Sequence, residues 1–119
     1  MKSQPFEAMV RYQPGLAIID LHGDINAFAE SSLNAAISEL DSQQPAAIVL
    51  NFNDVSYINS TGIALIVSIL AQARKFHRRV FVYGLTEHYE EIFKITRLSD
   101  FMAIHPDEAS ALVEAGKTG

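Results

Sequence analysis

The stretch NFNDVSYINSTGIALIV, residues 51–67, decides the fold. It continues an apolar, partly β-branched run at residues 46–50, which is typical of a strand covered on both faces. A cluster of small polar residues follows, Asn59-Ser60-Thr61-Gly62, and the remainder is almost entirely apolar. The pattern predicts a buried strand, a polar loop, and a helix from Ser60 to about residue 76. That helix is apolar nearly all round at its start, so we expect its first turns to be buried and its end to be exposed.

The chain before this stretch predicts a hairpin and a helix. Residues 6–12 alternate between apolar and polar side chains, Pro14-Gly15 turns the chain, and residues 16–21 form a second, more continuously apolar strand. Apolar residues then recur at helical spacing from Leu33 to Leu40, so we expect an amphipathic helix there. Asn26 is its predicted N-cap, since asparagine side chains accept hydrogen bonds from the free N–H groups of a first helical turn.

The chain after residue 76 repeats the alternation of strand and helix. The predicted elements are a strand at residues 80–84, a helix capped by Thr86 with Tyr89, Ile92 and Phe93 facing inward, a strand at residues 101–104, and a small helix from residue 106 to Gly116. Phe93 and Phe101 are both expected in the core. The resulting order, ββαβαβαβα, predicts a single α/β domain with a mainly parallel central sheet and an antiparallel N-terminal edge hairpin.

Composition narrows the class of protein. With 119 residues and 49% hydrophobic content, the chain suits one domain spanning residues 1–119. A net charge of −5 argues against nucleic acid or an anionic membrane surface as a partner. Cysteine is absent, which excludes disulfides and thiolate catalysis. Neither a targeting segment nor an apolar run of bilayer length is visible, so we expect a cytoplasmic protein.

The polar cluster at residues 59–62 admits two interpretations. In the first, Asn59 or Ser60 caps the following helix and Gly62 lets that helix pack closely against the strand. In the second, a loop at the carboxyl end of a parallel strand presents Ser60 for function, because such loops are where α/β sheets place functional groups. Phosphorylation there would add a charge of roughly −1.5 to −2 at a helix N-terminus that tolerates it, while a docked partner would not.

Catalysis and cofactor binding lack a recognisable pattern. The elbow motif G-x-S-x-G fails around Ser60 because residue 58 is isoleucine. His22, His88 and His105 are scattered without metal-ligand spacing, and no glycine-rich segment matches a phosphate-binding loop or a dinucleotide fingerprint. We therefore expect no catalytic residue, no metal and no cofactor, and predict that the protein is not an enzyme.

A run of cations follows the helix that starts at Ser60. It comprises Arg74, Lys75, His77, Arg78 and Arg79. Because cations interact favourably with the carbonyl end of a helix, we predict that this run is a solvated helix end rather than a binding patch.

Two segments together resemble the STAS domain family, of the anti-sigma factor antagonist type. In that family a strand leads into Asp-Ser-Ser/Thr-Gly-Leu, where this chain has Asn59-Ser60-Thr61-Gly62-Ile63, and an earlier strand ends in Gly-x-Leu-Asp, where this chain has Gly23-Asp24-Ile25-Asn26. The element order is also that of the family, and the similarity covers roughly residues 6–114. The resemblance implies a single STAS-like domain.

The resemblance also implies a function. Members of this type bind an anti-sigma factor, usually a serine kinase of the histidine-kinase-like ATPase fold, and so release a sigma factor. Ser60 would be the phosphoacceptor, phosphorylation would end binding, and a PP2C-type phosphatase would restore the unmodified form. The residues expected to bind the partner are Asn26, Asn59, Ser60, Thr61, Gly62 and Ile63.

Asn26 and Asn59 depart from the family, which has acidic residues at both positions. Amides keep the ability to hydrogen-bond but carry no charge, so neither can bind a metal strongly or act as a base. We expect the surface around Ser60 to dock a partner whether or not Ser60 is modified. The alternative is a non-switching STAS adaptor or scaffold subunit of a transporter or of a stress-sensing complex, which would not need Ser60 as a modifiable site.

Overall fold

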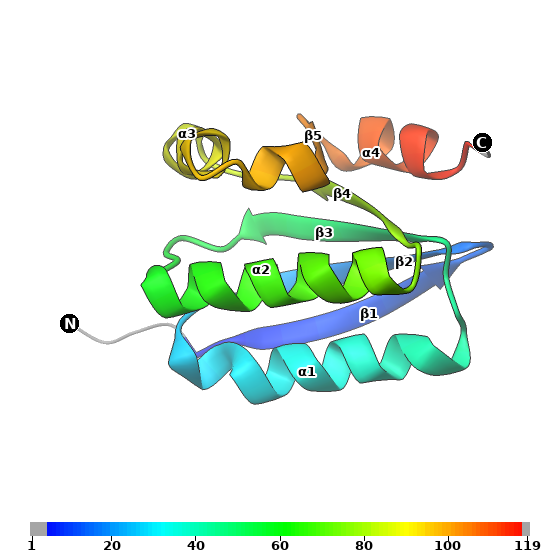
Figure 1. The fold of residues 1–119 in the computed structure, drawn as a ribbon, viewed down its shortest axis with the longest axis horizontal. Helices are drawn as coiled ribbons and strands as arrows, with labels where there is room; N and C mark the ends of the chain where they lie inside the picture. The colour runs from blue at the N-terminus through cyan, green and yellow to red at the C-terminus, as the bar shows by residue number, and fades with distance from the viewer. Residues whose placement is uncertain (1–4, 118–119) are drawn as a thin grey trace.

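The computed structural model describes residues 5–117, which contain one five-stranded sheet with helices on both faces (Figure 1). The elements are β1 (Glu7–Gln13), β2 (Leu16–His22), η1 (Ala27–Ala29), α1 (Glu30–Glu39), η2 (Leu40–Ser42), β3 (Ala47–Asp54), α2 (Ser60–Lys75), β4 (Arg79–Tyr83), α3 (Glu87–Ile95), η3 (Leu98–Phe101), β5 (Ala103–His105) and α4 (Glu108–Ala115). No helix among the described residues is both long and apolar enough to cross a membrane.

The strands lie in the order β1-β2-β3-β4-β5, the order in which they occur in the chain. β1 is antiparallel to β2, with Val10 opposite Ile19, and the three remaining pairs are parallel. Each parallel pair is joined through a helix, which such a connection requires. The predicted architecture, a mainly parallel sheet with an antiparallel edge hairpin, is confirmed.

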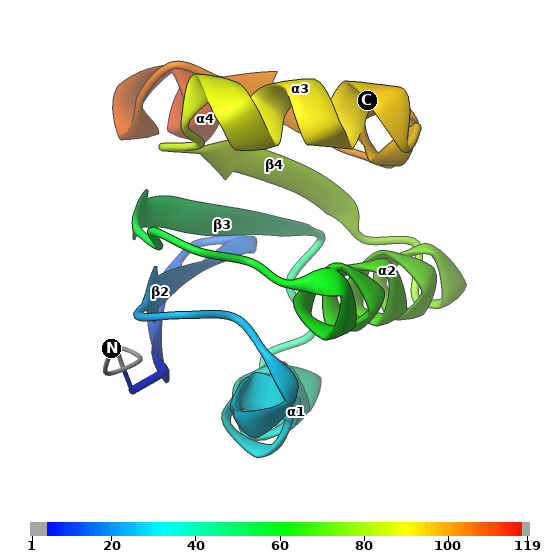
Figure 2. The same cartoon turned by 90° about the vertical axis from the view of Figure 1, so that its left-hand side faces the viewer.

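The central strands are covered on both faces. On β2, Ala17, Ile19 and Leu21 join one core with α1, α2 and α3, while Leu16 and Ile18 join a second core with α4. Figures 1 and 2 show α1 and α2 on the same side of the sheet and α4 on the other. Successive strand side chains point to opposite faces, so a strand buried on both sides must be apolar at nearly every position.

The last strand begins later than predicted, and Phe101 lies outside the core. β5 starts at Ala103, and Phe101 belongs to η3 with 53% of its surface exposed, whereas Phe93 is fully buried as expected. Arg97 adopts a left-handed conformation, with φ of 67°, directly before η3. The chain changes direction after α3 at this residue, and Phe101 is exposed at the end of η3. A hydrophobic pattern does not predict such a change of chain direction.

α2 is buried on one side only, so the prediction that its first turns are buried holds for the face toward the sheet and is wrong for the outer face. Gly62, Ile66, Ile69, Leu70 and Ala73 face the core, while Ser60, Thr61, Ala64 and Val67 are exposed, Val67 to 45%. The reason is that α2 packs on the sheet with no further layer of the described chain covering its outer face. Its exposed end, at Gln72, Arg74 and Lys75, agrees with the prediction.

The cationic run after α2 is only partly solvated. Arg78 is 9% exposed, with its guanidinium carbon 5.1 Å from the centre of the Phe76 ring and one of its nitrogens 3.7 Å from an Asp41 carboxylate oxygen. Arg79 donates a 2.8 Å hydrogen bond to the Ala115 carbonyl at the end of α4. The predicted solvated helix end is therefore wrong for these two arginines, which tie α2 and β4 to other elements.

Candidate functional site

The two segments that were singled out in the sequence meet at the edge of the sheet where β2 and β3 end. The Gly23 N–H donates to the Asp54 carbonyl at 3.0 Å, and the Ile25 N–H donates to the Tyr57 carbonyl at 2.9 Å. The Asn59 N–H then donates back to the Ile25 carbonyl at 3.2 Å. These backbone hydrogen bonds hold the β2–α1 loop and the β3–α2 loop as one unit.

Both asparagines that replace the family's acids are helix caps. Asn59 Oδ1 accepts from the Gly62 N–H at 2.8 Å, and Asn26 Oδ1 accepts from the Phe28 N–H at 2.9 Å. Asn59, not Ser60, is thus the N-cap of α2, and Asn26 caps the η1 turn that leads into α1. The amide oxygen supplies the hydrogen bond that a cap requires, so the loss of charge leaves the local fold intact.

Ser60 is left free of the capping role. It is the first residue of α2, its side chain is exposed, and Thr61 beside it is exposed as well. The free N–H groups of a first helical turn favour negative charge nearby. The site can therefore present a hydroxyl to an incoming enzyme and tolerate a phosphate on it.

Gly62 permits the close approach of α2 to the loop that precedes α1. A Cβ atom at this position would clash with the Ile25 carbonyl and with the Ile58 side chain. The predicted tight packing is therefore real, but its partner is the backbone of the neighbouring loop rather than the strand. Gly62 is buried and Ile63 partly buried, so the accessible polar groups among the predicted docking residues belong to the other four.

A tyrosine of α3 is hydrogen-bonded to the β3–α2 loop. The Ile58 N–H donates to Tyr89 Oη at 2.7 Å, and the Tyr89 hydroxyl lies 3.4 Å from the Ile58 carbonyl, with both residues buried. Thr86 caps α3 as predicted, because its hydroxyl accepts from the Tyr89 N–H at 3.3 Å. The loop that carries Ser60 is thus anchored to a third element.

Two exposed aromatic residues that the sequence analysis did not select belong to the segments that meet at this edge of the sheet. Phe28 is 90% exposed in η1, two residues after Asn26, and Tyr57 is 53% exposed in the loop bound to Ile25. Exposed large apolar side chains that gather at one place mark interaction sites. A signal was available for Phe28, since it precedes the helix and lies off its apolar stripe. We call Asn26, Phe28, Tyr57, Asn59, Ser60 and Thr61 the Ser60 surface.

A network of polar and charged side chains connects the sheet with α4. An Arg11 nitrogen lies 2.6 Å from an Asp20 carboxylate oxygen, and Asn51 donates to the other Asp20 oxygen at 2.8 Å. These bonds hold the pKa of Asp20 below its ordinary value. Burial, with a hydrogen bond to Glu108, raises the pKa of Tyr83 to about 12. Since Arg11 also pairs with Glu108, the network joins β1, β2, β3, β4 and α4, and we assign it the role of holding the sheet together.

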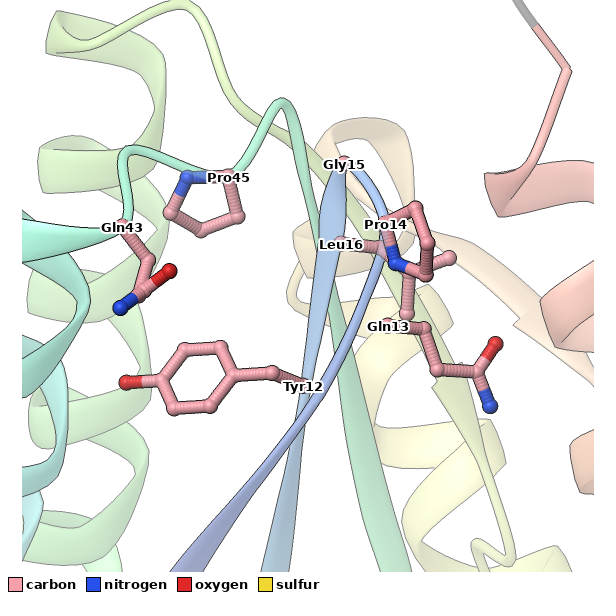
Figure 3. A pocket seen from close by; sticks show the side chains of 7 residues that line it. All are labelled: Tyr12, Gln13, Pro14, Gly15, Leu16, Gln43 and Pro45. Carbon is pink, nitrogen blue, oxygen red and sulfur yellow. The ribbon is translucent and has the colours of Figure 1, made fainter.

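The surface hollows of the described chain are lined by none of the predicted site residues. The one in Figure 3 has a volume of about 350 Å³ and lies where β2 begins, at the end of the strands opposite Ser60. Its lining side chains, which include Tyr12, Gln43 and Pro45, are uncharged. Within residues 5–117, no group of three histidine, aspartate or glutamate side chains is placed to hold a metal ion. The three histidines discussed above lie in different elements. His22 ends β2, His105 ends β5, and His88 lies in α3.

Comparison with known proteins gives concordant matches. The family model described as STAS domain matches residues 7–111. The anti-sigma-B factor antagonist of Staphylococcus aureus (strain NCTC 8325) is 23% identical over 73% of this chain and 81% of its own.

Two solved structures share the fold. An anti-sigma factor antagonist from Mycobacterium paratuberculosis has a TM-score of 0.80 at 18% identity, covering 94% of this chain and 95% of that one. The phosphorylated form of the Bacillus cell fate determinant SpoIIAA has a TM-score of 0.69 at 20% identity, covering 92% and 97%.

Proposed function

Because the chain belongs to the STAS domain family, we propose that it is an anti-sigma factor antagonist, which binds an anti-sigma factor through the Ser60 surface and so releases a sigma factor. The Staphylococcus relative and the Mycobacterium structure reported above are both named as antagonists of this kind. The observation that carries the proposal is the setting of Ser60, an exposed residue at the start of α2, where two hydrogen-bonded loops meet and where Phe28 and Tyr57 are exposed as well. Partners of this class place its action in the cytoplasm.

Phosphorylation of Ser60 is the proposed switch. The partner, a serine kinase of the histidine-kinase-like ATPase fold, transfers the γ-phosphoryl group of ATP to Ser60 Oγ. The bond from the γ-phosphorus to the bridging oxygen breaks, ADP leaves, and the hydroxyl proton is released. In the free protein the N-terminus of α2 accommodates the phosphate. In the complex the same charge is buried against the partner, which costs several kcal/mol unless it is paired, and about 1.4 kcal/mol is a tenfold change in affinity. A PP2C-type phosphatase hydrolyses the phosphate and restores binding.

The amides at positions 26 and 59 fit this switch. Asn59 caps α2 without placing a negative charge next to the phosphate, so the modified state is not opposed by a neighbouring carboxylate at that position. The fold itself accommodates such a state, since SpoIIAA has been solved in a phosphorylated form. Both caps remain satisfied in the unmodified protein, so the docking surface does not depend on phosphorylation for its shape.

The test is affinity capture from the native cell lysate with the wild-type chain, Ser60→Ala and Ser60→Asp as baits. Ser38→Asp, an exposed position in α1, controls for the added charge. Mass spectrometry identifies the captured proteins and any phosphate on Ser60. We expect a kinase-like anti-sigma factor on wild type, Ser60→Ala and Ser38→Asp, its loss from Ser60→Asp, and phosphate on wild-type Ser60.

The opposite result would favour a different function. If all four baits retain the same partners and Ser60 is never modified, the polar cluster is a helix start only. The chain would then be a non-switching adaptor or scaffold subunit of a transporter or of a stress-sensing complex.

A further inference from the structure

A groove on the outer face of the molecule runs along the second half of α2. It has a volume of about 250 Å³ and is lined by Val67, Leu70, Ala71, Arg74, Leu98 and Phe101. Leu70 and Leu98 are buried and form its floor, while Val67 and Phe101 stand exposed on its two sides. The groove is therefore apolar at its centre and open to solvent.

The exposure of these side chains follows from the two features that the sequence pattern did not foresee. Val67 is exposed because nothing in the described chain covers that side of α2, and Phe101 is exposed at the end of η3, the short helix that follows the left-handed residue Arg97. The Arg74 guanidinium carbon lies 5.7 Å from the centre of the Phe101 ring, within cation–π range. Within residues 5–117 no carboxylate pairs with Arg74, so its charge remains available to a binding partner.

A second hollow of about 410 Å³ continues the groove at its cationic end. The two share Leu70, Arg74 and Phe101, and the second adds His77, Arg78 and Arg79. None of the side chains that line either hollow is acidic. Arg78 is buried and paired with Asp41, whereas Arg74 and Arg79 have no carboxylate partner within residues 5–117, so in a chain whose net charge is −5 this surface is locally positive. Such a surface selects for a negatively charged partner and against a positively charged one.

We propose that this groove, which we call the α2 groove, is a second docking surface and that its occupant is an acidic amphipathic helix of another protein. Apolar side chains of that helix insert between Val67 and Phe101, and its carboxylates lie against Arg74, which has no carboxylate partner among the described residues. The combination of an apolar centre with an adjoining cationic end selects this occupant over a neutral or basic segment.

The α2 groove is separate from the Ser60 surface. Val67 and Arg74 lie seven and fourteen residues beyond Ser60 on the same helix, which places them about 10 and 20 Å along its axis. At the nearer distance a phosphate on Ser60 is largely screened at physiological ionic strength, and more so at the farther. Binding in the groove is thus independent of the proposed phosphorylation, and the proposal stands or fails separately from the proposed function.

The experiment uses a fluorescein-labelled peptide in which leucines recur at helical spacing among glutamates. One control peptide has lysine in place of glutamate, and another has alanine in place of leucine. Binding is followed by anisotropy, and the contacted residues are mapped by amide shifts of the isotope-labelled chain. We expect the acidic peptide alone to bind the wild-type chain measurably and to shift the amides of Val67, Ala71, Arg74 and Phe101.

Variants separate specific from general effects. Phe101→Ser and Arg74→Glu should each weaken binding at least about tenfold. Ile95→Ser, which removes an exposed apolar side chain outside the groove, and Lys117→Glu, which makes the same charge change elsewhere, should leave binding unchanged. Ser60→Asp should also leave it unchanged.

Three results would overturn the proposal. One is no binding of the acidic peptide at about 1 mM, a concentration that detects even weak complexes. Another is a set of amide shifts at Asn26, Tyr57 and Ser60 instead of the groove. The third is a dimer in sedimentation velocity that is abolished by Phe101→Ser, which would assign the groove to a second copy of this chain.

Discussion

The two ends of helix α2 are held in place by different kinds of interaction. At the Ser60 end the contacts are uncharged: two amide caps, backbone hydrogen bonds between loops, and the close approach at Gly62. At the far end they are cationic, with Arg78 buried against Phe76 and Arg79 bound to the end of α4. We therefore expect one added negative charge to alter the electrostatic character of the Ser60 end far more than that of the far end. Modification is most effective where the surrounding contacts are neutral.

The largest effect at the uncharged end should come from Gly62→Ala. The added Cβ meets the Ile25 carbonyl, so α2 must move away from the loop or the loop must shift. We expect the free energy of unfolding, measured by urea titration, to fall by about 3 kcal/mol. Gly116→Ala is the matched control, because that glycine has ordinary helical φ and lies at the end of α4, and its effect should be small. Equal stability of the two variants would show that the close approach at Gly62 is not needed.

A smaller effect should follow from Tyr89→Phe, which removes one hydroxyl. The buried Ile58 N–H then has no acceptor, so we expect a loss of about 2 kcal/mol in the free energy of unfolding. Hydrogen exchange should also show faster exchange of the amides between Val55 and Ser60. Tyr57→Phe is the control, since its side chain is exposed. Unchanged exchange in Tyr89→Phe would mean that α3 does not support the Ser60 loop.

The cap at Asn59 provides a finer test of whether charge matters at this end. Asn59→Ala removes the acceptor for the Gly62 N–H and should cost about 1 kcal/mol in thermal or urea unfolding. Asn59→Asp retains the acceptor and adds a favourable charge at a helix N-terminus, so it should be neutral or stabilise by about 0.5 kcal/mol. If the aspartate variant were as unstable as the alanine variant, the amide would have a role beyond capping.

The smallest expected effect concerns a charged network outside both ends, and it depends on pH. The pKa of Asp20 is lowered by its hydrogen bond to Arg11, so its folded value lies below that of the unfolded chain. Its contribution to stability is complete above the ordinary value of 3.8 and is lost as the pH falls through the folded pKa. Asp20→Asn should flatten the stability curve below about pH 4 and leave its slope near neutral pH unchanged. A pH dependence identical to wild type would exclude this network as its source.

The architecture and the meeting of the two loops were predictable because they depend on local pattern and on the parallel sheet. Alternation in the first strand, apolar runs in the inner strands and caps at Asn26 and Thr86 each follow from neighbouring residues. The meeting of the two loops follows from the parallel sheet, since the carboxyl ends of parallel strands share one edge. The capping role of Asn59 remained open in the sequence because adjacent serine and asparagine residues are both good caps.

What could not be predicted depends on contacts between distant segments. The apolar run in α2 does not tell whether a second layer covers it, and Val67 is exposed because none does. Arg78 is buried through Phe76 on one side and Asp41, from a distant segment, on the other. Phe101 has an apolar side chain but ends η3, which follows the left-handed residue Arg97. No hydrophobic pattern encodes that backbone conformation.

The most direct test of the central claim is a calorimetric titration of the anti-sigma factor recovered in the capture experiment with the wild-type chain, Ser60→Ala and Ser60→Asp. If a charge at this uncharged end controls docking, Ser60→Ala should bind as wild type does and Ser60→Asp at least about a hundredfold more weakly, a difference of roughly 2.7 kcal/mol. Equal dissociation constants for all three proteins would contradict the claim that Ser60 is the switch.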